Sequence, residues 1–235
     1  MIPPASWPRR GTVAGPGVHR ASPSPVSRVA LTRWKIERAY GRLAAVYDWL
    51  FGATFALGRR LAVRRLRLRP GARILEVGVG TALTARLFPR WTSVVGVDLS
   101  RPMLQRAARR LSRLRSPHVQ LVQMDAERLA FPANSFDVVY AAYVLTAVPD
   151  PVVVLREMER VCRPGGQIVV VNHFTTASAL ESVVDRLVAP AATWFGFRTD
   201  VALGPLLRAI GMTPDRVHQE RVGPVWTLAS WHARE

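Results

Sequence analysis

The sequence LEVGVGTALT, residues 75–84, puts two glycines directly after a short, mostly apolar segment, Arg73–Val77. Such a segment, bounded by glycines, is typical of a buried strand that ends in a tight loop. Glycine adopts backbone conformations that other residues avoid, and it leaves room for a ligand beside the backbone. In an open α/β sheet, ligands bind at the carboxyl ends of the strands. The stretch therefore predicts a first strand followed by a ligand-binding loop at Gly78 and Gly80.

Strand and helix patterns alternate along the chain from this point. The expected strands are Ser93–Val97, Val119–Gln123, Phe136–Tyr140 and Gln167–Asn172, and the expected helices are Ala82–Phe88, one that follows Ser100, one from Pro151 to about Cys162, Ser178–Ala189 and Val201–Ile210. Ser100 and Asp150 are the expected N-caps, each close to a proline. Arg216–Arg221 and Val225–Trp231 are expected to form a hairpin. This alternation predicts an α/β domain with a parallel sheet and helices on both faces.

The length of 235 residues suits one α/β domain. Residues 1–28 are rich in proline and contain no acid, so we expect a disordered basic tail. Residues 29–69 carry two helical patterns, Val29–Phe51 and Ala53–Leu68, and residues 70–235 form the expected domain. The first helix has one apolar stripe, made of Ile36, Tyr40, Leu43, Tyr47 and Leu50. We therefore expect amphipathic helices in front of the domain.

The net charge of +17, from 33 basic and 16 acidic residues, favours anionic partners. Nucleic acid and the headgroups of an acidic membrane are the two obvious classes. No run reaches the roughly 18 consecutive apolar residues that a spanning helix needs, so we expect any membrane contact to be peripheral. The only cysteine, Cys162, excludes an internal disulfide and is expected to be a buried structural thiol.

Acidic residues stand at or near the ends of three successive expected strands. They are Glu76, Asp98 and Asp125. A dinucleotide-binding loop would need a third glycine where the chain has Leu83, and Glu76 would stand close to a pyrophosphate. Asp98 is placed to accept hydrogen bonds from both hydroxyls of a ribose, and Asp125 from the amino group of an adenine. The pattern therefore favours an adenosine ligand that carries no phosphate.

Four stretches carry a family resemblance: LEVGVGTALT (75–84), VVGVDLSRPML (94–104), MDAERLAFPANSFDVV (124–139) and RVCRPGGQIVVVNHF (160–174). In order and spacing they resemble the motifs of class I S-adenosylmethionine-dependent methyltransferases, whose fold is Rossmann-like. The resemblance covers about residues 40–200 and implies S-adenosylmethionine as cofactor. Its sulfonium and ammonium groups would be attracted by Glu76. The implied cofactor-binding residues are Glu76, Gly78, Gly80, Thr81, Asp98, Leu99, Met103, Asp125 and Ala126. Ala82 replaces a usual glycine, and a small side chain should be tolerated there.

Shorter strings are similar to bacterial phosphatidylethanolamine N-methyltransferases that bind the membrane peripherally. They are AYGRLAAVYD (39–48), AYV (142–144), VPDP (148–151), NHF (172–174) and GFRTD (196–200). Phe197 and Val201 depart from the tryptophan and phenylalanine expected in that family. The resemblance implies transfer of methyl groups to the headgroup amine of phosphatidylethanolamine, toward phosphatidylcholine. Residues 144–147 lack the histidine pair common in quinone methyltransferases, which argues against a quinone.

Candidates for the acceptor side follow from this chemistry. His173 and Tyr47 are the expected catalytic residues, for accepting a proton or for holding the amine. Tyr40 and Tyr143 are expected to face the methylated cation, and Arg186 and Arg198 to hold the lipid phosphate. His173 as an ordinary helix-start residue, and the tyrosines as ordinary packing, stay open. So do a quinone, another small molecule or RNA as acceptor, and a non-catalytic subunit that binds the cofactor.

The expected partners are a phospholipid substrate and an anionic membrane surface, with no nucleic acid, because no RNA-binding module is visible. The expected location is the cytoplasm, at the inner face of the cytoplasmic membrane.

Overall fold

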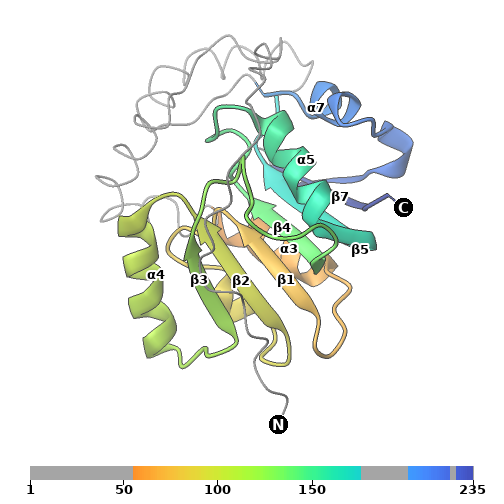
Figure 1. Ribbon diagram of the computed structural model, residues 1–235. Helices are drawn as coiled ribbons and strands as arrows, with labels where there is room; N and C mark the ends of the chain where they lie inside the picture. The colour runs from red at the N-terminus through yellow and green to blue at the C-terminus, as the bar shows by residue number, and fades with distance from the viewer. Residues whose placement is uncertain (1–54, 176–200, 223–225, 235) are drawn as a thin grey trace.

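A computed structural model describes residues 55–175, 201–222 and 226–234 of the chain. Within them, seven strands form one sheet in the order β3-β2-β1-β4-β5-β7-β6 (Figure 1). The elements are α3 (Ala56–Arg65), β1 (Arg73–Val77), η1 (Ala85–Leu87), β2 (Ser93–Asp98), α4 (Arg101–Arg113), β3 (Val119–Gln123), β4 (Phe136–Ala142), α5 (Pro151–Val161), β5 (Cys162–Asn172), α7 (Leu203–Ala209), η2 (Pro214–Arg216), β6 (His218–Val222) and β7 (Trp226–His232). This is the Rossmann-like α/β arrangement that the sequence predicts.

The first five strands pair in parallel, and β6 and β7 form the predicted antiparallel hairpin. β7 pairs antiparallel with β5, which places the hairpin at one edge of the sheet. The chain leaves β1 toward β2 and β3 and then returns to β4 on the other side. The carboxyl ends of β1 and β4 therefore flank a topological switch point, where open α/β sheets bind their ligands.

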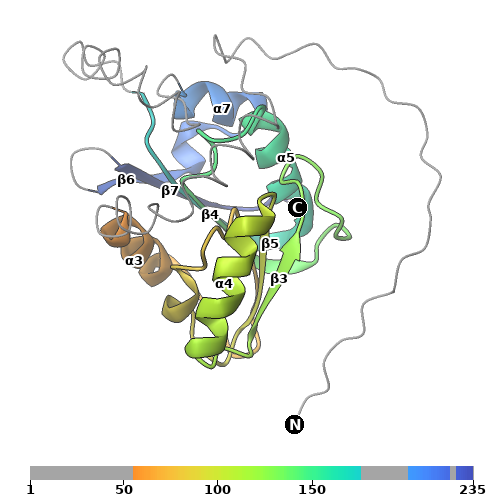
Figure 2. The same ribbon diagram turned by 90° about the vertical axis from the view of Figure 1, so that its left-hand side faces the viewer.

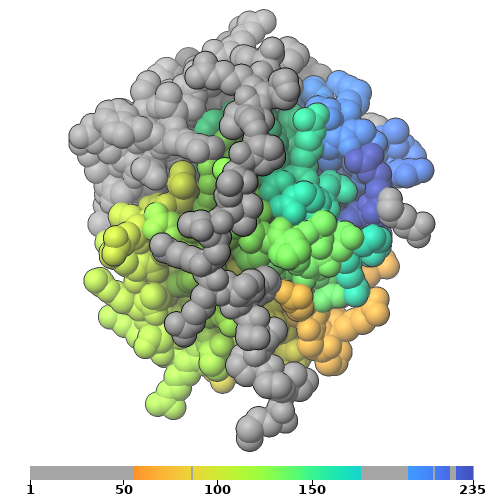
Figure 3. Space-filling view, in the orientation of Figure 1, coloured from red at the N-terminus to blue at the C-terminus, as the bar shows by residue number. Residues whose placement is uncertain are grey.

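Helices cover both faces of the sheet, as expected (Figure 2). Alternate residues of β1 show the division. Ile74 packs in one core with Ala62 of α3 and Ala107 of α4. Leu75 packs in the other core with Leu155 of α5, and Leu206 of α7 belongs to that core as well. In the space-filling view, α4 (yellow-green) lies at one edge of the molecule and α7 (blue) near the other (Figure 3).

Both predicted N-caps are confirmed. The hydroxyl of Ser100 accepts from Met103 N at 3.4 Å, at the start of α4. The carboxylate of Asp150 accepts from Val152 N at 2.9 Å and from Val153 N at 3.2 Å, at the start of α5. Each cap stands at the carboxyl end of the sheet, so the caps also fix loops that border the switch point.

The helix expected over Ala82–Phe88 is wrong in extent, because only Ala85–Leu87 forms a helical turn. Ala82 has φ of +58°, a left-handed conformation that no α-helix contains. The small side chain of Ala82 is accommodated, but the left-handed backbone costs more strain with alanine than it would with the usual glycine. Pro89 comes two residues after the turn, and its missing backbone N–H prevents the turn from continuing as a helix.

Helix α3 ends three residues before the expected Leu68. The side-chain amide of Gln167, from β5, donates to Arg65 O at 3.0 Å and accepts from Arg67 N at 2.8 Å. These bonds take the place of helical ones, and Leu66 is extended.

Cys162 is buried, as expected, and burial raises the pKa of its thiol to about 12. Such a thiol is a poor nucleophile at neutral pH. In the part of the chain that the structure describes, no helix is long and apolar enough to span a bilayer. The expected elements Val29–Phe51 and Ser178–Ala189 lie outside the described residues.

Candidate cofactor site

A pocket opens at the switch point, between the carboxyl ends of β1, β2 and β4. It is lined by Gly78, Gly80, Val97, Asp98, Leu99, Ser100, Met103, Met124, Asp125, Ala126, Ala142, Tyr143, Val144, Ala147, Val148 and Pro149. Seven of the nine residues that the sequence predicts for the cofactor are in this lining, and so is Tyr143.

The loop after β1 takes its shape from two glycines, Gly78 and Gly80. Gly78 and Gly80 have φ of +68° and +53°, which glycine adopts without steric cost. A Cβ at Gly78 would lie 2.3 Å from Cγ2 of Val144, so only glycine fits between the loop and the end of β4. At Gly80 a Cβ would meet nothing within 4 Å, and this residue leaves the backbone open to the pocket.

Asp98 joins this loop to the start of α4. Its carboxylate accepts from Gly80 N and from Ser100 N, each at 2.8 Å. Burial raises the pKa of Asp98, and these two backbone hydrogen bonds oppose the rise. Each carboxylate oxygen has a further lone pair, so Asp98 can still accept from the hydroxyls of a ribose in the pocket.

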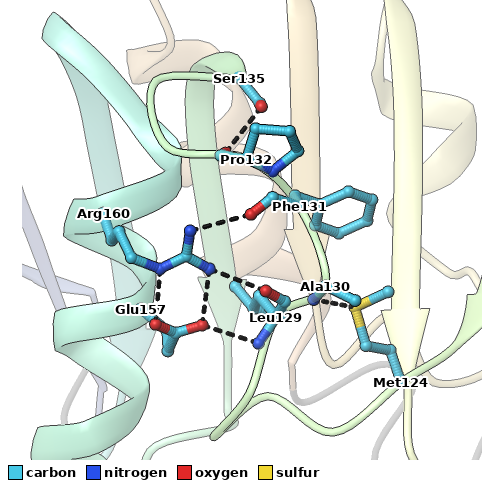
Figure 4. Close-up of polar contacts among 8 residues, drawn as sticks. All are labelled: Met124, Leu129, Ala130, Phe131, Pro132, Ser135, Glu157 and Arg160. Carbon is cyan, nitrogen blue, oxygen red and sulfur yellow. Dashed lines mark hydrogen bonds and ion pairs between the residues drawn. The ribbon is translucent and has the colours of Figure 1, made fainter. Parts of the chain in front are cut away.

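Asp125 is held on the opposite wall by a chain of hydrogen bonds. Its Oδ1 accepts from Glu127 N at 2.9 Å, and Glu127 Oε1 accepts from Asp150 N at 2.8 Å. The loop that follows is fixed by α5 (Figure 4). Arg160 donates to Leu129 O at 2.7 Å and to Phe131 O at 2.8 Å, while Glu157 accepts from Leu129 N at 2.7 Å. Arg160 is a contributor that the sequence reasoning missed.

The charge of the pocket matches a cationic ligand. Among the described lining residues there is no lysine or arginine, although the chain has 33 basic residues, and two carboxylates face the space. A pyrophosphate would find no counter-charge here. A ribose between Asp98 and the glycine loop, with an adenine against Leu99, Met103 and Ala126, fits the donors, acceptors and apolar walls present.

Glu76 and Thr81 are outside the lining. Glu76 is 3% exposed and, by the alternation of side chains along β1, is on the same face of the sheet as Ile74, which packs with α3. Burial raises its pKa to about 8, against the opposing effects of a hydrogen bond with Thr84 and of the charge of Arg59. Glu76 is therefore largely uncharged at neutral pH. This differs from the attraction to a cofactor cation that the sequence predicts. Thr81 accepts from Nη1 of Arg110 through both its carbonyl oxygen and its hydroxyl.

Tyr143 borders the pocket but is also tied to α3. Its ring stacks on Phe55 with centroids 4.3 Å apart, and the Arg59 guanidinium lies 5.9 Å from the ring centroid. Trp226, from β7, meets its edge at 4.8 Å. Tyr143 therefore packs against other aromatic rings and also contacts a cation, and that cation is the guanidinium group of Arg59.

His173 follows β5 directly and meets the ring of Trp226 edge-on at 6.4 Å. It is one aromatic ring away from Tyr143. The neighbouring Asn172 is buried, accepts from Leu145 N at 3.2 Å and donates to Thr146 Oγ1 at 2.9 Å. Asn172 belongs to the NHF string of the family resemblance, but no role was predicted for it, and Trp226 was not singled out, because the partners of both are distant in the chain. Tyr40, Tyr47, Arg186 and Arg198 lie outside the described residues.

Comparison with known proteins agrees with this geometry. The methyltransferase domain family matches residues 75–170. The chain belongs to the class I S-adenosylmethionine-dependent methyltransferases, and S-adenosylmethionine is its cofactor.

Among its relatives is a phosphatidylethanolamine N-methyltransferase of Cereibacter sphaeroides, 37% identical over 185 residues, which are 76% of this chain and 90% of that protein. A demethylmenaquinone methyltransferase of Beutenbergia cavernae is 34% identical over 68% of this chain, and the match spans 60% of that protein.

The fold is also that of a solved Haemonchus contortus phosphoethanolamine N-methyltransferase 2 in complex with S-adenosyl-L-methionine. The TM-score is 0.68 at 19% identity, over 88% of this chain and 61% of that one.

Proposed function

We propose that the protein methylates the headgroup amine of phosphatidylethanolamine, and of its partly methylated forms, toward phosphatidylcholine. The observation that carries the proposal is the 37% identity to a phosphatidylethanolamine N-methyltransferase along 90% of that protein's length. The match to the demethylmenaquinone enzyme spans 60% of that protein's length. The absence of a histidine pair at residues 144–147 supports the same choice.

The chemistry requires an amine lone pair in line with an electrophilic methyl group, which S-adenosylmethionine supplies when bound. Most of the rate enhancement then comes from positioning. Asp98 and the glycine loop hold the adenosine part, and Val144, Ala147 and Val148 give the pocket an apolar wall that excludes water. His173 is the proposed acceptor of the proton that the substrate ammonium must lose, either directly or through water.

The bilayer must also be reached by the active site. We propose that residues 29–51 lie on an anionic membrane surface. Trp34 and Trp49 stand off the apolar stripe, and tryptophan is favoured at the headgroup layer. Each basic residue near an anionic surface contributes about 1 kcal/mol. Co-sedimentation with anionic vesicles should weaken with salt and with Arg38→Glu plus Arg42→Glu. Equal binding to neutral vesicles, insensitive to both, would contradict this.

The decisive experiment supplies labelled S-adenosylmethionine with defined acceptors. Vesicles of phosphatidylethanolamine should become labelled, whereas phosphatidylglycerol, which has no amine, and phosphatidylcholine, which is already trimethylated, should not. Parallel reactions contain demethylmenaquinone and RNA. Asp98→Ala is the control for enzyme-dependent transfer. Label in the quinone or in RNA, with none in phosphatidylethanolamine, would refute the proposed substrate. Cofactor binding without transfer to any acceptor would support a non-catalytic subunit.

A further inference from the structure

A second cleft lies at the opposite end of the sheet from the cofactor pocket, and its volume is about 490 Å³. It is lined by Arg64, Arg65, Leu66, Arg67, Gln167, Arg216, His218, Ser230, Trp231 and His232. The C-terminal end of α3, the start of β5 and the β6–β7 hairpin form its walls. In Figure 3 the segment after α3 (orange), the start of β5 (teal) and the end of β7 (dark blue) lie near one another on the right-hand side.

Most of the positive charge in this cleft has no carboxylate partner among the described residues. Of the four arginines that line it, Arg65 is paired with Glu220, at 2.8 Å. Within the described ranges 55–175, 201–222 and 226–234, no carboxylate or carbonyl accepts a hydrogen bond from the guanidinium groups of Arg64, Arg67 or Arg216. The nearby Asp215 has a hydrogen bond with Thr213. This bond is the main cause of the lowered pKa of Asp215, and the charge of Arg216 contributes less.

Other arginines of the domain do have a carboxylate partner. Arg163 pairs with Asp137 at 2.7 Å, and Arg160 pairs with Glu157 at 2.7 Å. A smaller cleft of about 310 Å³ shares Arg67, Gln167 and His232 with the first and adds Arg69 and the ion-paired Arg163 and Asp137. The basic surface is therefore an extended groove, with guanidinium groups spaced along it.

We propose that this cleft binds a soluble molecule carrying two or more phosphate groups. Guanidinium groups bind phosphate oxygens in a bidentate manner, and several of them can divide an oligophosphate between them. A water molecule takes about 30 Å³ of liquid, so the cleft has room for an extended ligand. The floor is preformed, because Gln167, Leu66 and Trp231 are buried and Gln167 is held by two hydrogen bonds to the chain after α3.

The location separates this site from the methyl-transfer site. Arg59 of α3 contacts Tyr143 at the pocket end, and Arg65 lies at the other end of a helix about 15 Å long. A membrane docked on the cleft would hold the cofactor pocket away from the lipid. A flat bilayer also fits a concave groove poorly. Single-stranded nucleic acid needs exposed rings for stacking, whereas Trp231, the one aromatic ring of Phe, Tyr or Trp type in the described lining, is buried.

The test is calorimetric titration of the full chain with sodium tripolyphosphate. We expect saturable binding that weakens at least about tenfold in Arg67→Gln plus Arg216→Gln, because each change removes a charge-assisted contact. The matched control is Arg106→Gln plus Arg109→Gln, two exposed residues of α4, which removes the same charge and should change the affinity less than about twofold. S-adenosylmethionine affinity, measured in parallel, should be unchanged in both and shows that the variants fold.

Equal weakening by the two double variants would overturn the proposal, because the binding would then follow the overall charge and not the cleft. The absence of saturable binding would overturn it as well. Titrations with phosphatidylglycerol vesicles and with single-stranded RNA distinguish the source of the anion. If the cleft variant loses binding to one of these and tripolyphosphate does not bind, the ligand class is wrong.

Discussion

The hydroxyl of Tyr143 donates a hydrogen bond to the carbonyl oxygen of Phe55 at 2.9 Å, across 88 residues of sequence. Tyr143 lines the cofactor pocket and has φ of +64°, a strained conformation for a bulky residue. Phe55 is the N-cap residue of α3. The bond therefore ties the pocket to the first turn of α3.

Gly58 provides the first test of this contact. A Cβ at Gly58 would lie 2.2 Å from the Tyr143 hydroxyl, so Gly58→Ala should lower the free energy of unfolding by about 1–3 kcal/mol. Tyr143→Phe should cost about 0.5–1.5 kcal/mol through the lost hydrogen bond. In the double variant the clash with the hydroxyl is gone, and urea unfolding should give a cost clearly below the sum. Gly204→Ala is the control, because its Cβ would meet only the end of Arg208, at 3.5 Å. Strict additivity would contradict this geometry.

A pH dependence follows from the buried carboxyl of Glu76. Its pKa is raised by burial from 4.5 to about 8, so the folded state holds the proton more firmly than the unfolded state. The stability that this proton provides is complete below the unfolded pKa and is lost as pH rises through the folded one. Wild type should thus lose stability relative to Glu76→Gln by several kcal/mol over this window. Unfolding curves of both proteins between acid and mildly alkaline pH measure the difference. A constant difference would show that Glu76 does not carry the buried proton.

The strands and the ligand loop could be predicted from the sequence because their signals are local. Short apolar runs and Gly78-x-Gly80 determine where strands end, and a parallel sheet brings those ends together. The exact extent of Ala82–Phe88 and of α3 could not be predicted. Ala82 takes a left-handed conformation, and Gln167 draws the chain out of α3 from about 100 residues away. Tertiary contacts of this kind override local propensity.

The residues of the candidate site also fall into those that the local sequence predicts and those whose environment depends on tertiary contacts. Asp98 and Asp125 could be identified because Asp98 ends β2 and Asp125 stands two residues after the end of β3. The environment of Glu76 could not be predicted, since burial, Thr84 and Arg59 set its pKa together. Trp226 reaches Tyr143 only through the antiparallel return of β7 along β5. A sequence signal did exist for Arg160, whose three-residue spacing from Glu157 is that of a helical ion pair.

Asp98→Ala should weaken S-adenosylmethionine binding by at least about tenfold, through the lost charge-assisted hydrogen bonds to the ligand and the loosened glycine loop. Calorimetry measures the affinity. Ser100→Ala is the matched variant. It removes the hydroxyl that caps α4 but keeps the backbone N–H that donates a hydrogen bond to Asp98. It should cost about 1 kcal/mol of stability and leave the affinity within a few fold. If Asp98→Ala binds the cofactor as wild type does, the assignment of Asp98 is wrong.

The last prediction concerns the contact between α5 and the loop after Asp125. Arg160 binds both carboxylate oxygens of Glu157, at 2.7 and 2.8 Å, and donates to two carbonyl oxygens of the loop. Burial raises the pKa of Glu157, but the hydrogen bonds from Arg160 and Leu129 N lower it overall. The pair therefore keeps a charged acceptor aimed at Leu129 N and holds the loop after Asp125 against α5.

Arg160→Met keeps an unbranched chain about as long as the aliphatic part of the arginine but removes every one of these donors. We expect S-adenosylmethionine affinity to fall severalfold, with a smaller change in kcat, because the loop follows Asp125 and Ala126, which are the residues proposed to contact the adenine and not the reacting atoms. Amide exchange at Leu129 should accelerate, since its acceptor loses the partner that orients it. Arg156→Met is the control on the same helix: it removes a bond to Ala209 O in α7, at 3.1 Å, and leaves the loop untouched. Accelerated exchange at Leu129 with unchanged cofactor affinity would show that the pair stabilises the loop without shaping the pocket. An effect of equal size in Arg156→Met would trace the loss to α5 as a whole.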